Sequence, residues 1–291
     1  MDSDGSNLIA GCRTITERVY TSTDYGDDWT EGQPAGDVDG AWLEAASDDD
    51  GSNLIIAGSY GVFTSNDYGA NWEERDPSGT GSFSGYAVAS DSDGSNLMSS
   101  EWEGRLYTST NSGASWTERR PAGDADYRWW SMASNSDGSR LAAANQSDLY
   151  ISADGGSTWT ERFPYGSNVS TGWEVAMSED GAFLIAGSGG NLYMSSDYGA
   201  TWSITATTSG QSWEAVACDS DGSNYIAGRY LQYFKGVYIS IDSGVTVSYK
   251  TPSSSYSHNG WVGGAIDSDG SHMLIGSDGG SIWRGVWSWA L

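Results

Sequence analysis

Short apolar runs separated by clusters of Gly, Asp, Ser and Asn follow one another along the whole chain. Four kinds of run succeed each other in a constant order, as at 173–177, 183–186 and 192–195 and in the segment that begins at Trp202. Runs of this length, rich in β-branched and aromatic residues and bounded by turn-forming residues, predict strands joined by hairpins. No stretch places apolar residues at helical spacing. The pattern therefore predicts an all-β chain of short antiparallel strands.

The pattern repeats with a period of about 44 residues, which is typical of a four-stranded propeller blade. A turn motif, Asp-Gly followed by Ser or Ala, marks each period, with its Asp at Asp4, Asp50, Asp93, Asp137, Asp180, Asp221 and Asp269. The repeats run through the whole chain, so we expect a single β-propeller domain over residues 1–291.

The number of blades follows from counting the runs. There are seven second and seven third strands, but six first and six fourth strands. We favour seven blades of four antiparallel strands, in which incomplete first and last blades meet to close the ring. Six blades is the alternative, in which the innermost strand near Trp261 completes the N-terminal blade.

A second motif, Ser-x-Asp-x-Gly-x-x-Trp, has the same period. It occurs in six phased copies, of which the third has Asn111 in the place of Asp and the sixth has Val247 in the place of Trp. The Asp side chain is suited to accepting backbone N–H groups across a turn, Gly permits a positive φ, and Trp packs as an outer anchor. We therefore expect structural roles for Asp24, Asp67, Asn111, Asp154, Asp197, Asp242, Trp29, Trp72, Trp116, Trp159 and Trp202.

This second motif resembles the Asp-box, or bacterial neuraminidase (BNR) repeat, and its copies cover nearly the whole chain. That repeat occurs in sialidases, xyloglucan-degrading hydrolases, sortilin-type receptors and photosystem II assembly-factor-like propellers. The resemblance implies a propeller with one Asp-box in each blade, where the box folds the blade and does no chemistry. The repeat length and the aromatic residue that opens each first strand are most similar to the assembly-factor and xyloglucan-hydrolase branches.

Aromatic residues open every first strand. First strands line the central channel of a propeller, so these rings should gather near one mouth of it. One interpretation is packing between blades; the other is a platform that stacks on sugar rings or on apolar side chains of a protein partner. The residues concerned are Trp42, Tyr86, Trp129, Trp130, Trp173, Trp213 and Trp261.

The charge of the chain excludes one class of partner. Thirteen Lys and Arg stand against 39 Asp and Glu, giving a formal charge of −26. Nucleic-acid binding depends on clustered cationic residues that displace counterions, so neither DNA nor RNA is an expected partner. No apolar run approaches the roughly 18 residues of a membrane-spanning helix, so no membrane span is expected.

Catalysis and metal binding have weaker support. A sialidase-like site would need an arginine triad, and the Arg-Ile-Pro element that carries its first arginine is missing. A xyloglucan-type hydrolase would use two propellers that flank a cleft, and this chain predicts one. The Asp-Ser-Asp-Gly segments resemble calcium loops but lack the closing Glu, so we interpret them as hairpin turns and expect no metal or other cofactor. Weak calcium binding at these turns is the alternative.

The sequence therefore predicts an acidic, extracellular, monomeric propeller that binds glycan or protein through one face of the ring without catalysis. A glycoside hydrolase of the sialidase or xyloglucan-hydrolase type is the first alternative. An assembly-factor-like protein binder is the second.

Overall fold

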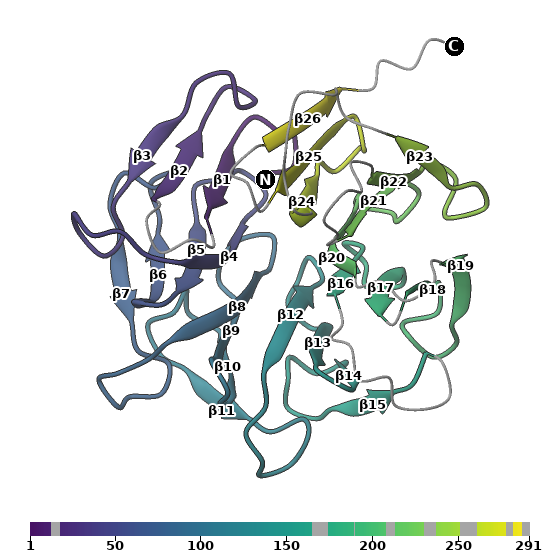
Figure 1. Cartoon of the computed structure of the whole chain (residues 1–291). Helices are drawn as coiled ribbons and strands as arrows, with labels where there is room; N and C mark the ends of the chain where they lie inside the picture. The colour runs from purple at the N-terminus through teal and green to yellow at the C-terminus, as the bar shows by residue number, and fades with distance from the viewer. Residues whose placement is uncertain are drawn as a thin grey trace.

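The computed structural model describes residues 1–12, 18–164, 174–188, 190–207, 213–229, 237–250, 261–277 and 282–286. In these residues 26 strands form seven antiparallel sheets arranged around a central channel (Figure 1). The expected all-β propeller of four-stranded antiparallel blades is confirmed. It arises because each hairpin turn is short, so consecutive strands pair with each other in chain order.

Five sheets have four strands each, and their first-named strand lies innermost. They are β4 (Trp42–Ser47), β5 (Leu54–Gly58), β6 (Gly61–Ser65) and β7 (Glu73–Arg75); β8 (Gly85–Ser90), β9 (Leu97–Glu101), β10 (Leu106–Ser109) and β11 (Thr117–Arg119); β12 (Trp129–Ser134), β13 (Leu141–Asn145), β14 (Leu149–Ser152) and β15 (Thr160–Arg162); β16 (Glu174–Met177), β17 (Leu184–Ser188), β18 (Asn191–Ser195) and β19 (Ser203–Thr207); and β20 (Trp213–Cys218), β21 (Tyr225–Arg229), β22 (Val237–Ser240) and β23 (Ser248–Lys250).

The two remaining sheets come from the ends of the described chain and have three strands each. They are β1 (Leu8–Gly11), β2 (Val19–Ser22) and β3 (Thr30–Gly32), and β24 (Trp261–Ile266), β25 (His272–Ser277) and β26 (Ile282–Val286). By their place in the repeat, β1 to β3 are second, third and fourth strands, whereas β24 to β26 are first, second and third strands. Among the described residues, Trp261–Ile266 pairs with β25 and not with β1.

A circle of backbone hydrogen bonds joins the seven sheets at one end of the channel. The residue before each Asp-Gly dipeptide donates its N–H to the C=O of the equivalent residue in the next turn, over 2.8 to 3.2 Å. The bonds run in order through Ser3, Asp49, Ser92, Ser136, Glu179, Ser220 and Ser268, and the last of these donates back to Ser3. The first and last sheets are therefore neighbours, and the turns hold the ring together as well as joining strands.

Candidate functional site

The Ser-x-Asp-x-Gly loops have a geometry that explains why their residues recur. In one copy Ser195 Oγ donates to Asp197 Oδ1 over 2.8 Å, and the same carboxylate oxygen accepts the backbone N–H of Thr201 over 2.8 Å. Trp202 Nε1 donates to the Gly199 C=O over 3.0 Å, and Gly199 has a φ of +76°. The Asp197 carboxylate thus accepts hydrogen bonds from within its own turn, which is a structural role.

The side-chain hydrogen bond from Thr201, together with its backbone N–H, lowers the pKa of Asp197 to about 2. Equivalent bonds lower the pKa values of Asp24, Asp67, Asp154 and Asp242. In the copy that has Asn111, the side-chain carbonyl accepts the Ser115 N–H over 2.9 Å, so an amide oxygen replaces the carboxylate oxygen as the acceptor of this bond. The five Trp side chains of these loops, at 29, 72, 116, 159 and 202, are half-buried, which is less than expected for an outer anchor.

The carboxylates of the Asp-Ser-Asp-Gly turns also accept hydrogen bonds from their own turns. Asp91 accepts the backbone N–H of Asn96 over 3.0 Å and its Nδ2 over 2.5 Å, while Asp93 accepts the Ser95 N–H over 2.8 Å. These are the bonds of a hairpin turn. In the residues that the structure describes, no three His, Cys, Asp or Glu side chains are grouped so as to hold a metal ion.

The strand-opening aromatics are packing residues in most sheets, which corrects the platform interpretation. Trp42, Tyr86, Trp129, Trp213 and Trp261 are each 5% exposed or less. Each of three rings sits against a glycine of the preceding sheet: a Cβ on Gly11, Gly187 or Gly228 would lie 2.5 to 2.7 Å from the Cβ of the Trp that follows in the ring. A side chain wedged between two sheets cannot stack on a ligand. Trp173 lies outside the described residues.

Trp130 behaves differently from the other predicted aromatics. The pairing of β12 with β13 shifts register between Trp129 and Ser131, so Trp130 occupies a β-bulge. Its side chain is half-buried and lines the channel. Of the predicted platform, Trp130 alone among the described residues therefore keeps part of its surface available to a ligand.

Two exposed aromatics that the sequence analysis did not single out lie in the turns between second and third strands. Tyr60 is 47% exposed and Trp102 is 42% exposed. The Trp102 ring contacts Tyr86 at a centroid distance of 4.9 Å, and Tyr86 in turn meets Trp130 edge-on at 5.6 Å. We call Tyr60, Trp102 and Trp130 the aromatic rim. In the sequence, Tyr60 and Trp102 could have been identified as a pair because they occupy equivalent turns of neighbouring repeats.

The rim is held rigidly. Glu103 follows Trp102 in the turn with a φ of +52°, a backbone state that non-glycine residues rarely adopt. An isolated bridge pairs Gly104 with Tyr127, which ties this turn to the loop before β12. Arg105 donates to the C=O of Ala125 over 3.0 Å and forms an ion pair with Asp126 at 2.8 Å. Ordering these groups in advance lowers the entropy cost of binding.

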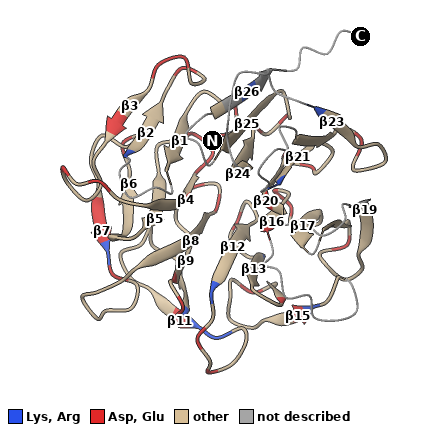
Figure 2. Cartoon of the chain, in the orientation of Figure 1, with Lys and Arg blue, Asp and Glu red and all other residues tan. Residues whose placement is uncertain are grey.

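Charge around the rim is mixed rather than basic. Arg128 lies over the Trp102 ring, with its Cζ 4.3 Å from the ring centroid, and forms an ion pair with Glu103. Arg120 is likewise paired, with Glu118 and Asp124. Figure 2 shows acidic residues along the outer strands β3 and β7 as well. The rim thus presents ring surface and carboxylates together, a combination suited to hydroxyl-bearing ligands.

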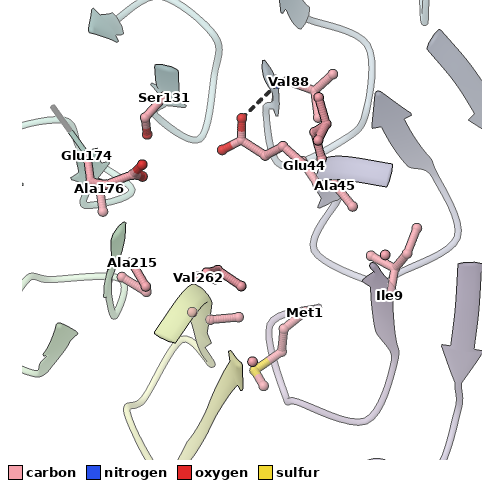
Figure 3. Close-up of a pocket in the computed structure, with 18 of the residues that line it drawn as sticks. Met1, Ile9, Glu44, Ala45, Val88, Ser131, Glu174, Ala176, Ala215 and Val262 are labelled. Atoms are coloured by element: carbon pink, nitrogen blue, oxygen red, sulfur yellow. Dashed lines mark hydrogen bonds between the residues drawn. The ribbon is translucent and has the colours of Figure 1, made fainter. Parts of the chain in front are cut away.

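The channel contains a cavity of about 510 Å³ lined by the innermost strands. Two carboxylates, Glu44 and Glu174, point into it from β4 and β16 (Figure 3). Glu44 Oε2 accepts the backbone N–H of Val88 in the neighbouring sheet over 3.1 Å. This glutamate therefore links two sheets as well as giving the channel negative charge.

One pair of carboxyl groups has unusual proton affinity. Burial raises the pKa of Asp148, in the turn between β13 and β14. Burial, the charge of Asp148 and a hydrogen bond with it raise the pKa of Glu161. Carboxyl groups in hydrogen-bonding contact are closer than the roughly 5 Å of a retaining glycosidase, so this pair does not have that geometry.

Comparison with solved structures supports the fold. YCF48 bound to a D1 peptide is 14% identical, with a TM-score of 0.71 over 99% of this chain and 90% of that one. A GH74 xyloglucanase from Xanthomonas campestris is 19% identical, with a TM-score of 0.70 over 98% of this chain. An ancestral GH74 enzyme is 18% identical, with a TM-score of 0.68 over 85% of this chain.

This chain spans about half of the xyloglucanase, at 51%, and 36% of the ancestral enzyme. The expected likeness in fold to assembly-factor and xyloglucan-hydrolase propellers is confirmed, and identities this low establish the fold alone. No protein-family model matches the chain, and neither does any curated protein sequence. In the described residues, no helix has the length and apolarity to cross a membrane.

Proposed function

We propose that this protein is a non-catalytic binding propeller that holds a glycan or a protein on the face of the ring that carries the aromatic rim. The observation that carries the proposal is Trp102, which is 42% exposed although it sits in a turn that other groups hold rigid. A tryptophan ring offers a rigid apolar face that stacks well on sugar rings and on apolar side chains.

Each of the seven sheets is taken as one blade, and all seven belong to one domain over residues 1–291. The circle of seven turn-to-turn hydrogen bonds supports this count, because it passes once through each sheet and closes between Ser268 and Ser3. A rigid closed ring gives its loops constant positions, which is what a binding face requires. The domain is taken to be monomeric and extracellular.

A glycan is the first ligand to test. The Tyr60 ring lies against Gly40, where an added Cβ would come within 2.7 Å of the ring carbons Cδ2 and Cε2. Part of the ring is therefore covered while 47% of the residue stays exposed. Carboxylates at Glu103, Asp124 and Asp126 surround the rim and are suited to accepting hydrogen bonds from sugar hydroxyls.

The test is a glycan array run beside a hydrolase screen on the same sugars, followed by two matched variants. Trp102→Ala should weaken binding by about fivefold or more while leaving the melting temperature unchanged. Trp129→Ala removes a buried ring one sheet away and should instead lower stability by about 3–5 kcal/mol. Binding that is insensitive to both Trp102→Ala and Tyr60→Ala would place the ligand elsewhere.

A glycoside hydrolase of the sialidase or xyloglucan-hydrolase type is the second candidate. The likeness in fold to a GH74 xyloglucanase supports it, whereas Asp148 and Glu161, despite their raised pKa values, lie too close together to act as the carboxyl pair of a glycosidase. Turnover in the hydrolase screen would select this candidate.

An assembly-factor-like protein binder is the third candidate, supported by the likeness in fold to YCF48 bound to a D1 peptide. Arg18, Arg105, Arg120 and Arg128 are each paired with carboxylates, so a peptide partner would meet ring surface rather than an open cationic patch.

A further inference from the structure

A cation from the protein itself lies on the Trp102 ring. The guanidinium carbon of Arg128 is 4.3 Å from the centroid of that ring, and the same guanidinium forms an ion pair with Glu103, the next residue in the turn. An aromatic face and a carboxylate side by side attract a cationic group, the first through the ring quadrupole and the second through its charge. Arg128 therefore shows which chemical group this part of the rim accommodates. We call the Arg128 guanidinium in this position the arginine cap.

The backbone that carries the arginine cap is held firmly, whereas its side chain is not. On one side the Tyr127 N–H donates to the Gly104 C=O over 3.2 Å, and on the other Trp129 is 3% exposed. The Nε atom of Arg128 is buried and has no hydrogen-bond partner among the described residues. A buried donor without an acceptor destabilises the conformation that contains it, which offsets part of the attraction to the ring and to Glu103. The side chain can therefore turn out into solvent while the strand stays in place.

The other side chain that contacts the Trp102 ring cannot move in this way. The Tyr86 ring lies 4.9 Å from the Trp102 ring between centroids, and Tyr86 is 5% exposed. It belongs to the same core cluster as Trp129 and Met132, where close packing fixes its position. Of these two contacts of the Trp102 ring, only the arginine cap can be displaced, so a ligand reaches the face under it by replacing Arg128.

Replacing the arginine cap removes two contacts, one with the Trp102 ring and one with Glu103. A neutral ligand such as a sugar restores the contact with the ring but leaves the Glu103 carboxylate without the guanidinium. A ligand that has its own guanidinium restores both contacts and releases Arg128 to water, where Nε is hydrated. The difference between these two exchanges favours the cationic ligand.

The charges around the turn also favour a cation. Burial, together with the charges of Asp126 and Asp76, raises the pKa of Glu101, the residue before Trp102. The part of this effect that comes from the two aspartates records negative potential at the turn. The whole chain has a formal charge of −26, which attracts a basic partner before contact is made.

We propose that the aromatic rim binds an arginine-containing peptide segment of a partner protein, whose guanidinium replaces the arginine cap over Trp102 and beside Glu103. This inference rests on the proposed function, because it names the ligand class of the same rim, and between glycan and protein it selects protein. Arg128 then competes with the ligand for the site. It limits binding to segments that bring a cation of their own.

The probe is the capped peptide acetyl-Gly-Arg-Gly-Arg-Gly-amide, and its matched control has citrulline in place of both arginines. Citrulline has nearly the shape of arginine but carries no charge. Binding to the unmodified protein is measured by isothermal titration calorimetry and by the NMR signal of the Trp102 Nε1–H, which is assigned by its loss in Trp102→Phe. The arginine peptide should shift this signal and should bind about tenfold or more tightly than the citrulline peptide.

Three variants test the competition. Arg128→Gln shortens the side chain and removes its charge, so it should raise the affinity for the arginine peptide about threefold or more, because the binding-competent state is then more populated. Glu103→Gln removes the charge that pairs with the guanidinium and should weaken binding about tenfold. Trp102→Ala should abolish it. Melting curves check that each variant is folded, and the citrulline comparison needs no variant.

The inference is overturned if the citrulline peptide binds as tightly as the arginine peptide, or if Arg128→Gln leaves the affinity unchanged or lowers it. A glycan whose binding is lost in Trp102→Ala, with no binding of the arginine peptide at millimolar concentration, would refute the inference and leave the proposed function standing. Binding of glycan and peptide that are both insensitive to Trp102→Ala would refute the inference and the proposed function together.

Discussion

Replacing isoleucine by alanine in the two identical Leu-Ile-Ala-Gly strands should have unequal effects on stability. Ile185 in β17 is fully buried and packs with Phe183, Leu192 and Trp213. Its truncation removes three carbon groups worth about 0.8 kcal/mol each and leaves a cavity, for a total of about 3–4 kcal/mol. Ile9 in β1 is half-buried and lines the channel cavity, so its truncation leaves no closed cavity and should cost about 1 kcal/mol.

These free energies convert to separable melting shifts. At about 2.1 cal/mol/K per residue, a chain of 291 residues has an unfolding entropy near 0.6 kcal/mol/K if it unfolds as one unit. Ile185→Ala should then lower the melting temperature by about 5–7 °C, and Ile9→Ala by about 2 °C or less. Differential scanning calorimetry measures both shifts, and urea unfolding checks that the slope of the free energy with denaturant is unchanged. Equal losses in the two variants would mean that β1 is as well covered as β17, against the difference in burial between the two strands.

Three other predictions concern the turns and the charge. Asp197→Asn should match the wild-type protein near neutral pH, as the natural Asn111 does, whereas Asp197→Ala should melt lower because the Thr201 N–H loses its acceptor. Because the pKa of Asp197 is lowered to about 2, its contribution is present above pH 4 and is lost as pH falls toward 2, so melting curves over this range should fall more steeply for wild type than for Asp197→Asn. Gly222→Ala should cost about 1–3 kcal/mol more than Gly36→Ala, since both have positive φ but only the first would place a Cβ 2.2 Å from buried Phe183; similar unfolding free energies would refute this. With a formal charge of −26, the melting temperature should rise from low to moderate NaCl, and a large rise at sub-millimolar calcium that chelation abolishes would instead indicate specific calcium sites in the Asp-Ser-Asp-Gly turns.

Much of the fold could be predicted from the sequence because the signals are local. The strand period, the Asp-Gly turns and the Ser-x-Asp-x-Gly loops each depend on residues within about five positions of one another, as the bonds from Ser195 to Thr201 show. The count of first and fourth strands likewise agrees with the described part of the chain, in which six sheets show a first strand and six show a fourth.

The candidate site was less predictable. The aromatics that open the first strands are conspicuous in the sequence, yet Trp42, Trp213 and Trp261 are buried because the preceding sheet offers each of them a glycine, as Gly187 does for Trp213. Trp102 is a single residue in a turn, and the sequence does not show that Tyr86 and Arg128 contact its ring and hold it in place.

The two copies of Leu-Ile-Ala-Gly separate what local sequence determines from what the tertiary structure determines. Local sequence determined that residues 8–11 and 184–187 are both strands, because alternation and flanking turns act over a few residues. Whether each strand is covered was decided by the tertiary structure, since the covering strand comes from a different part of the repeat. β16 supplies that cover for β17, and no described strand supplies it for β1. Burial is a property of neighbours in space, so identical residues end in a closed core at one place and at the surface of the channel at the other.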